Sequence, residues 1–183
     1  MKAPESIETE RLLLRRPRHS DAQNIFRNYA GDPQVTRFLS WPTHASVADT
    51  WAFLDWSDRE WEQWPAGPYL VFLRDESSRR VLGSVGLAFT SPEKAMAGYA
   101  LSCEAWGKGF ATEALSAVVS LARQLNLHEL EAVCHADHAA SARVLEKCGF
   151  QLQCRRERHT LFPNLEPGIR ADTLLYALPL NRD

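Results

Sequence analysis

The chain has 183 residues, of which 45% are hydrophobic and 24% are charged. This length and balance are typical of one soluble globular domain, so we expect a single domain over residues 1–183. The net charge of -2 at pH 7 argues against a surface that binds nucleic acid. No apolar run approaches the roughly 18 residues that a membrane span needs, and residues 1–10 lack the apolar core of a secretory signal.

The four cysteines form no Cys-x-x-Cys pair. Reduced thiols are therefore expected rather than a disulfide framework, and no metal site is expected. These features predict a cytoplasmic protein with no nucleic acid or membrane as partner. They leave a monomer and a homodimer both open.

The first third of the chain predicts one strand followed by two helices. Three leucines flanked by arginines predict a strand at 12–14. Ser20 and Asp21 are suited to cap a helix that runs to about residue 29, and the Gly-Asp-Pro sequence at 31–33 is expected to end it. A second helix is predicted over 46–61, with Ser46 as the cap.

Most of the aromatic bulk of the second helix is predicted to be core. One of its stripes is predicted to be core, and it comprises Val47, Trp51, Leu54 and Trp61. Phe53 and Trp56 lie on the opposite side of the helical wheel. They either pack against a neighbouring loop, which is the commoner arrangement, or line a pocket for an acceptor.

The rest of the chain alternates between strands and helices. Strands are predicted at 69–74, 81–89, 96–101, 130–135, 150–154 and 169–178, and helices at 108–125 and 139–148. A polar turn at 75–78 joins the first two of these strands, and Gly149 is suited to cap the last helix. The order β-α-α-β-β-β-α-β-α-β-β predicts an α/β (α+β) fold with a mixed sheet and helices on its faces.

The most informative motif is the glycine turn that opens the long helix. Gly107 and Gly109 allow the backbone to turn sharply and to approach a ligand closely. The first amides of a helix have no partner within the helix and lie at the positive end of its dipole, so such a turn suits a phosphate or pyrophosphate. A turn that merely joins a strand to a helix is the alternative. A phosphate-binding NTPase is excluded because Lys108 is followed by Gly109 rather than by Ser or Thr.

Several motifs, in their order along the chain, resemble the GNAT acetyltransferase family. They are Tyr-Ala-Leu at 99–101, Gly-Lys-Gly at 107–109 and Ser-Ala-Arg-Val-Leu-Glu-Lys-Cys-Gly-Phe at 141–150. The run Glu-Thr-Glu-Arg-Leu-Leu-Leu-Arg at 8–15 is similar to the ribosomal-protein-alanine (RimJ/RimL-like) branch. The resemblance implies a mixed, mostly antiparallel central sheet. That sheet would splay between its fourth and fifth strands, which end at Leu101 and His135, with helices on both faces.

The resemblance also implies acetyl-CoA as co-substrate and no metal. The glycine turn would bind the pyrophosphate through its amides, and pantetheine would lie between the splayed strands as an added strand. The expected cofactor-binding residues are Leu101, Ser102, Cys103, Trp106, Gly107, Lys108, Gly109, Phe110, Ala111, Thr112, His138 and Ser141. Trp106 stands where the family usually has Gln or Arg, and His138 stands where it usually has Asn.

The implied reaction is the transfer of an acetyl group to a primary amine by direct attack. Ser141 either contacts the CoA sulfur and protonates the leaving thiolate, or is a small residue at a helix start. Backbone amides near 101–103 would stabilise the oxyanion. The candidates for the base are His135, Glu157, His159 and Glu104, and a water chain to a backbone carbonyl would also serve. Cys103 and Cys134 raise an acetyl-cysteine route, but no activating group stands at a fixed spacing from either.

The sequence is compatible with two functions. The first is an acetyl-CoA-dependent N-acetyltransferase that acts on a protein N-terminal α-amine or on a small molecule such as a polyamine, an amino acid or an antibiotic. The second is a catalytically impaired module that binds and senses acetyl-CoA.

Overall fold

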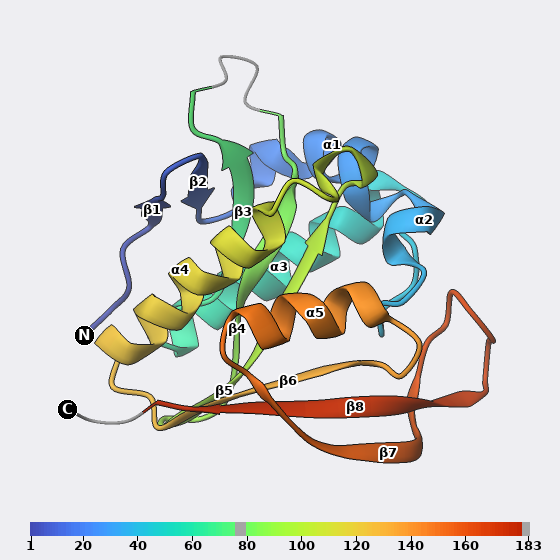
Figure 1. Ribbon diagram of the computed structural model, residues 1–183. Coiled ribbons are helices and arrows are strands. Elements are labelled where there is room, and N and C mark those ends of the chain that lie inside the picture. The colour runs from blue at the N-terminus through green and yellow to red at the C-terminus, as the bar shows by residue number, and fades with distance from the viewer. Residues whose placement is uncertain (76–79, 181–183) are drawn as a thin grey trace.

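A computed structural model describes residues 1–75 and 80–180 (Figure 1). The strands are β1 (Ser6–Glu8), β2 (Leu12–Arg15), β3 (Pro68–Leu73), β4 (Gly83–Ser91), β5 (Lys94–Leu101), β6 (Glu129–His135), β7 (Gln151–Leu161) and β8 (Arg170–Pro179). The helical segments are η1 (His19–Asp21), α1 (Ala22–Ile25), η2 (Phe26–Ala30), α2 (Pro33–Thr36), α3 (Val47–Gln63), η3 (Cys103–Ala105), α4 (Phe110–Gln124) and α5 (Ala139–Lys147). Most of the turn expected at 75–78 lies outside the described residues. Among the described helices, none is long and apolar enough to cross a membrane.

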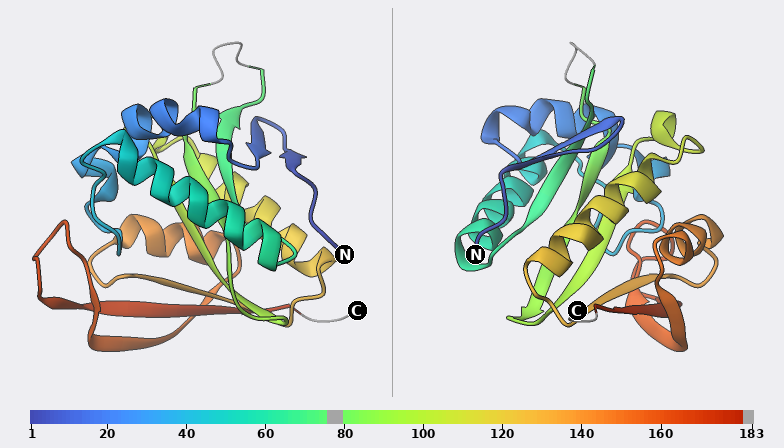
Figure 2. Two further views of the ribbon diagram at one scale, coloured as in Figure 1. Left: turned by 180° about the vertical axis from the view of Figure 1, so that it is seen from behind. Right: turned by 60° about the vertical axis from the view of Figure 1, so that its left-hand side comes forward.

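One mixed sheet of eight strands organises the described residues, in the order β1-β2-β3-β4-β5-β6-β8-β7. Every neighbouring pair is antiparallel except β5 and β6, which are parallel. Helices α1 and α3 cover one face of the sheet, and α4 and α5 cover the other (Figure 2). Successive side chains of a strand enter opposite layers, so that Leu70 packs under α1 and α3 while Val71 packs with α4. The predicted fold class is confirmed.

The two parallel strands separate along most of their length. Pairing between β5 and β6 is confined to Lys94–Glu129, Ala95–Leu130 and Met96–Glu131. Beyond Met96 the strands diverge (Figure 1), which leaves an open edge on each of them. This is the splay that the sequence resemblance implies between the fourth and fifth predicted strands.

Local signals place the ends of several helices. Ser46 caps α3 in a capping box, in which its hydroxyl accepts from the amide of Ala48 and the Asp49 carboxylate accepts from the amide of Ser46. Gly109 precedes α4 in the left-handed region at φ +79°. Gly149 follows α5 at φ +90°, where a side chain would be strained.

Two expectations from the sequence are wrong in detail. Trp51 is 52% exposed rather than core, because the buried stripe of α3 runs through Thr50, Leu54, Ser57 and Trp61. The Gly-Asp-Pro sequence at 31–33 ends one helix but also begins another. The Asp32 carboxylate accepts from the Gln34 amide at 2.8 Å and Pro33 occupies the first turn, so α2 forms where only a helix end was expected.

Candidate functional site

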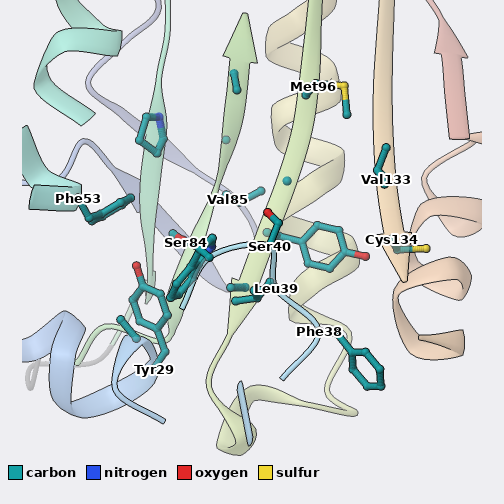
Figure 3. Close-up of a pocket in the computed structure, with 18 of the residues that line it drawn as sticks. Tyr29, Phe38, Leu39, Ser40, Phe53, Ser84, Val85, Met96, Val133 and Cys134 are labelled. Carbon is teal, nitrogen blue, oxygen red and sulfur yellow. The ribbon is translucent and has the colours of Figure 1, made fainter. Parts of the chain in front are cut away.

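A cavity of about 980 Å³ extends from the splay between β5 and β6 to the face of the sheet that α3 covers. Its walls come from the segment 38–45, from α3, from the middle of β4 and β5, from β6 and from the start of α5. Figure 3 shows Met96 and Val85 on the sheet, Val133 and Cys134 across the splay, and Phe53 and Tyr29 at the other end. The cavity joins the open strand edges to an aromatic chamber.

Ser141 and Tyr99 meet across the splay. The Tyr99 hydroxyl on β5 lies 2.8 Å from the Ser141 Oγ and 3.0 Å from the Ser141 carbonyl oxygen on α5. Burial raises the pKa of Tyr99, so its phenol stays protonated near neutral pH. Ser141 lines the cavity, and Tyr99 gives it a proton-bearing partner that no sequence motif identified.

Two histidines lie near the start of α5, but only His138 lines the cavity. Its ring stacks on Phe38 with centroids 4.5 Å apart, and burial, together with nearby His135, lowers its pKa. His138 is therefore a neutral imidazole at neutral pH. The His135 Nδ1 accepts a hydrogen bond from the Asp137 amide at 3.1 Å, and its ring packs against Phe38 and Phe162. That packing holds His135 behind the wall of the cavity.

The other candidates for the base lie outside the cavity wall. Glu104 pairs with Arg80 at 2.8 Å, on the outer side of the turn before α4. Glu157 and His159 are exposed on β7. The structure therefore brings Ser141, Tyr99 and His138 together and leaves the acidic candidates apart from them.

Neither cysteine of the acetyl-cysteine route is activated. Cys134 lines the cavity, but burial raises the pKa of its thiol to about 11. Partial burial and the neighbouring Asp32 raise the pKa of Cys103 as well. A thiol must lose its proton to act as a nucleophile, so this environment favours direct attack.

The glycine turn forms a concave backbone surface at the start of α4. Gly107 and Gly109 both have positive φ, at +72° and +79°. The first backbone bond that enters the helix from the turn runs from the Glu113 amide to the Gly109 carbonyl. The amides before it point out of the helix start, where they can meet an anion. No side chain caps this end of α4.

Arg11 and Glu113 brace this turn. The Glu113 carboxylate accepts from the Thr9 hydroxyl at 2.6 Å, from the Arg11 amide at 2.8 Å and from the Arg11 guanidinium at 2.7 Å. Arg11 also donates to the Lys108 carbonyl at 2.9 Å and lies over the Phe110 ring. The β1–β2 turn is thereby tied to the start of α4. The sequence alone did not predict this brace, because Arg11 and Glu113 lie 102 residues apart along the chain.

The strand end before the turn is fixed by two further bonds. The Trp106 indole donates to the Leu101 carbonyl at 2.7 Å, so this side chain holds the end of β5. The Ser102 amide donates to the Leu82 carbonyl at 2.7 Å, so this amide is bonded within the sheet. The backbone N–H groups of successive residues in a strand point to opposite edges. The amides of Tyr99 and Leu101 therefore point to the open edge of β5, away from β4.

Comparisons with known proteins agree with this geometry. The profile described as the acetyltransferase (GNAT) domain matches residues 11–151. An uncharacterized N-acetyltransferase of Bacillus subtilis (strain 168), YoaA, is 30% identical over 180 residues, which are 97% of this chain and 98% of the relative.

Two solved structures illustrate the shared fold. RimL, a ribosomal L7/L12 alpha-N-protein acetyltransferase in complex with coenzyme A, has a TM-score of 0.84 at 21% identity, over 98% of this chain and 100% of that one. The microcin C7 self-immunity acetyltransferase MccE, in complex with acetyl-CoA and AMP, has a TM-score of 0.83 at 17% identity, over 97% of each chain. The family profile covers most of the chain, and the chain belongs to the GNAT family of N-acetyltransferases.

Proposed function

We propose that this protein transfers the acetyl group of acetyl-CoA to a primary amine by direct attack, as one cytoplasmic domain over residues 1–183. The observation that carries the proposal is the arrangement of three features. The glycine turn follows the end of β5, the edges of β5 and β6 are open beyond Met96, and Ser141 lines the cavity that both strands border. A pyrophosphate fits the first feature, a pantetheine arm the second and a thioester the third.

The chain's own groups fit the donor at each point. The amides of the turn and of the first residues of α4, from Gly107 to Thr112, would hold the pyrophosphate, and Arg11 keeps that backbone in place. The outward-facing groups of β5 at Tyr99 and Leu101 would bond the pantetheine arm. One of these amides also suits a developing oxyanion, since a fixed N–H needs no reorganisation.

Ser141 would deliver a proton to the departing thiolate. Its hydroxyl lies in the cavity wall, and Tyr99 is within hydrogen-bond distance of its oxygen. As the Ser141 proton goes to sulfur, the Tyr99 hydroxyl can pass its own proton to the serine oxygen, and solvent then returns a proton to the phenol. His138 is a neutral imidazole in the same wall, which suits it to take a proton from the ammonium group of the acceptor, so that the neutral amine can attack the thioester carbonyl. His138 thus replaces His135 and Glu157 as the preferred base.

The proposal is tested by the release of free CoA thiol when amines are added to the protein and acetyl-CoA. Turnover that depends on the amine supports it. Acetyl-CoA binding without turnover across a broad amine panel supports the sensing module instead. The resemblance to the RimJ/RimL-like branch makes peptides with a free N-terminus one arm of that panel.

A further inference from the structure

We infer that the acceptor is a small, singly charged amine carried on an apolar, aromatic-sized body, such as an arylalkylamine. The inference rests on the proposed function, because it assigns the second substrate of the same cavity. It departs from the protein N-terminus that the branch resemblance suggests. Four observations carry it: the position of the chamber, the chemistry of its wall, its charge and its rigidity.

The cavity has two ends with different surroundings. One end lies in the splay, between Met96 on β5 and Cys134 on β6, where the thioester arm fits. The other end lies against α3, where Phe53, Tyr29 and Ser84 approach one another in Figure 3. An amine that enters from this second end reaches the thioester without crossing the strand edges that the donor occupies.

The wall of the second end is dominated by aromatic rings. These rings belong to Tyr29, Trp41, Phe53 and Trp56. Phe38 and Phe162 also line the cavity, but they pack beside His135 and His138 near the start of α5. Phe53 and Trp56 lie on one side of α3 with ring centroids 5.9 Å apart, and Trp56 is 37% exposed despite its size. Both rings line the cavity, and Phe53 also packs against the buried cluster under α3, so these residues combine packing with a place in the wall. Flat apolar walls of this kind favour a ligand with a flat apolar body.

The charge of the wall selects against several acceptors. Within residues 1–75 and 80–180, the lining of the cavity includes no Lys, Arg or Glu and one carboxylate, Asp49. Backbone hydrogen bonds from Ser46 and Ala45 lower the pKa of Asp49, so it is ionised, whereas burial lowers the pKa of His44 and leaves that ring neutral. One carboxylate matches an acceptor with a single ammonium group, which must lose its proton before the amine attacks the thioester beside Ser141. A polyamine would place unpaired charges among the rings, and an acceptor with a carboxylate or phosphate would meet no cation.

The wall is held in place from a distant part of the chain. The Asn164 side-chain amide donates to the carbonyls of Thr36 and Trp41 at 2.7 and 2.8 Å, and its oxygen accepts from the Thr43 amide at 2.8 Å. The segment that carries Phe38 and Trp41 is therefore fixed before any acceptor binds, which favours a ligand that matches its shape. A peptide N-terminus would bring amide groups that need partners, and this wall consists mainly of rings and alkyl groups.

The inference is tested by comparing acceptors that differ in one property. Tryptophan has the ring system of tryptamine and a carboxylate in addition. Spermidine differs from tryptamine by carrying several positive charges, and a peptide that begins with alanine differs by carrying backbone amide groups. Thiol release is measured for each at saturating acetyl-CoA. We expect kcat/KM for tryptamine to exceed the other three by about tenfold or more, the discrimination that apolar pockets commonly reach. An equal or higher value for spermidine, tryptophan or the peptide overturns the inference and leaves the transferase proposal intact.

Variants on α3 supply the matched control. Trp56→Ala should raise the KM for tryptamine about tenfold and leave the KM for acetyl-CoA unchanged. Trp51→Ala removes the same side chain from the same helix, but Trp51 does not line the cavity, so both constants should stay unchanged. Equal effects of the two variants on tryptamine contradict the inference.

Calorimetric binding of tryptamine to the CoA-saturated protein decides the question even without turnover. Binding that Trp56→Ala weakens and Trp51→Ala does not supports the assigned pocket, while the missing turnover counts against the proposed function alone. Absence of tryptamine binding contradicts the inference.

Discussion

A carboxylate placed in the glycine turn gives the sharpest test of the donor site. In Gly109→Asp the new Cβ would lie 3.4 Å from the Arg11 guanidinium, and the carboxylate would stand at the start of α4. Arg11 is already paired with Glu113, so the added charge is not compensated. Two unit charges about 4 Å apart near a surface repel by about 4 kcal/mol, and salt screening reduces this to about 3 kcal/mol. We therefore expect acetyl-CoA to bind about 100-fold more weakly.

The same substitution at Gly168 provides the matched control. Gly168 also has φ +79°, and a Cβ there meets nothing within 4 Å. Both variants carry the same left-handed strain of about 1–2 kcal/mol and the same added charge, so their losses of stability in urea should be similar. Only Gly109→Asp should lose acetyl-CoA affinity in a calorimetric titration. Unchanged affinity of Gly109→Asp, or an equal loss in Gly168→Asp, would refute the pyrophosphate assignment.

Three further variants test the chemistry and the brace. Ser141→Ala should lower kcat about 100-fold and change the affinity for CoA little, because the Ser141 hydroxyl supplies a proton to the leaving thiolate. Steady-state kinetics measures kcat and calorimetry measures the affinity. A change in affinity with no change in kcat would show that Ser141 has only a structural role. Cys134→Ala should keep kcat within about threefold, since its thiol stays protonated with a pKa of about 11; complete loss of turnover with normal folding would point to an acetyl-cysteine.

Glu113→Gln should cost about 1–2 kcal/mol of unfolding free energy at pH 7, because it removes charged hydrogen bonds to Arg11 and Thr9. Partial burial alone would raise the pKa of Glu113, but the hydrogen bonds from Thr9 and Arg11 together lower it. The extra stability of the wild type over the Gln variant is therefore complete above the ordinary glutamate pKa of about 4.3. It is lost as pH falls through the lowered pKa of Glu113. An equal urea-midpoint difference at pH 7 and in strong acid would contradict this.

The sequence predicted the elements whose signals are local. Ser46 identified the start of α3, and the glycine turn identified the start of α4. The splay followed from family resemblance rather than from these patterns, because it depends on how two strands separate after three paired residues. Propensity and periodicity describe one element at a time and contain no information on that separation.

Parts of the site that join distant segments escaped prediction for the same reason. Glu113 and Arg11 are 102 residues apart, and Asn164 bonds to Thr43 across 121 residues. Neither pair has a local pattern that would identify it. The predicted burial of Trp51 was also wrong, since a helical wheel cannot tell which of two adjacent stripes the sheet will cover. For Phe53 and Trp56 the sequence left packing and a pocket both open and favoured packing, because a helical wheel does not show what lies opposite a ring.

The central claim is that this chain transfers acetyl groups from acetyl-CoA to an amine through the glycine turn and the splay. Mass spectrometry of a reaction that contains the protein, acetyl-CoA and the amine panel tests it most directly. The account predicts an N-acetylated amine and free CoA in equal amounts, with both lost in Gly109→Asp and retained in Gly168→Asp. Free CoA without an acetylated amine, or equal product from both variants, would contradict it.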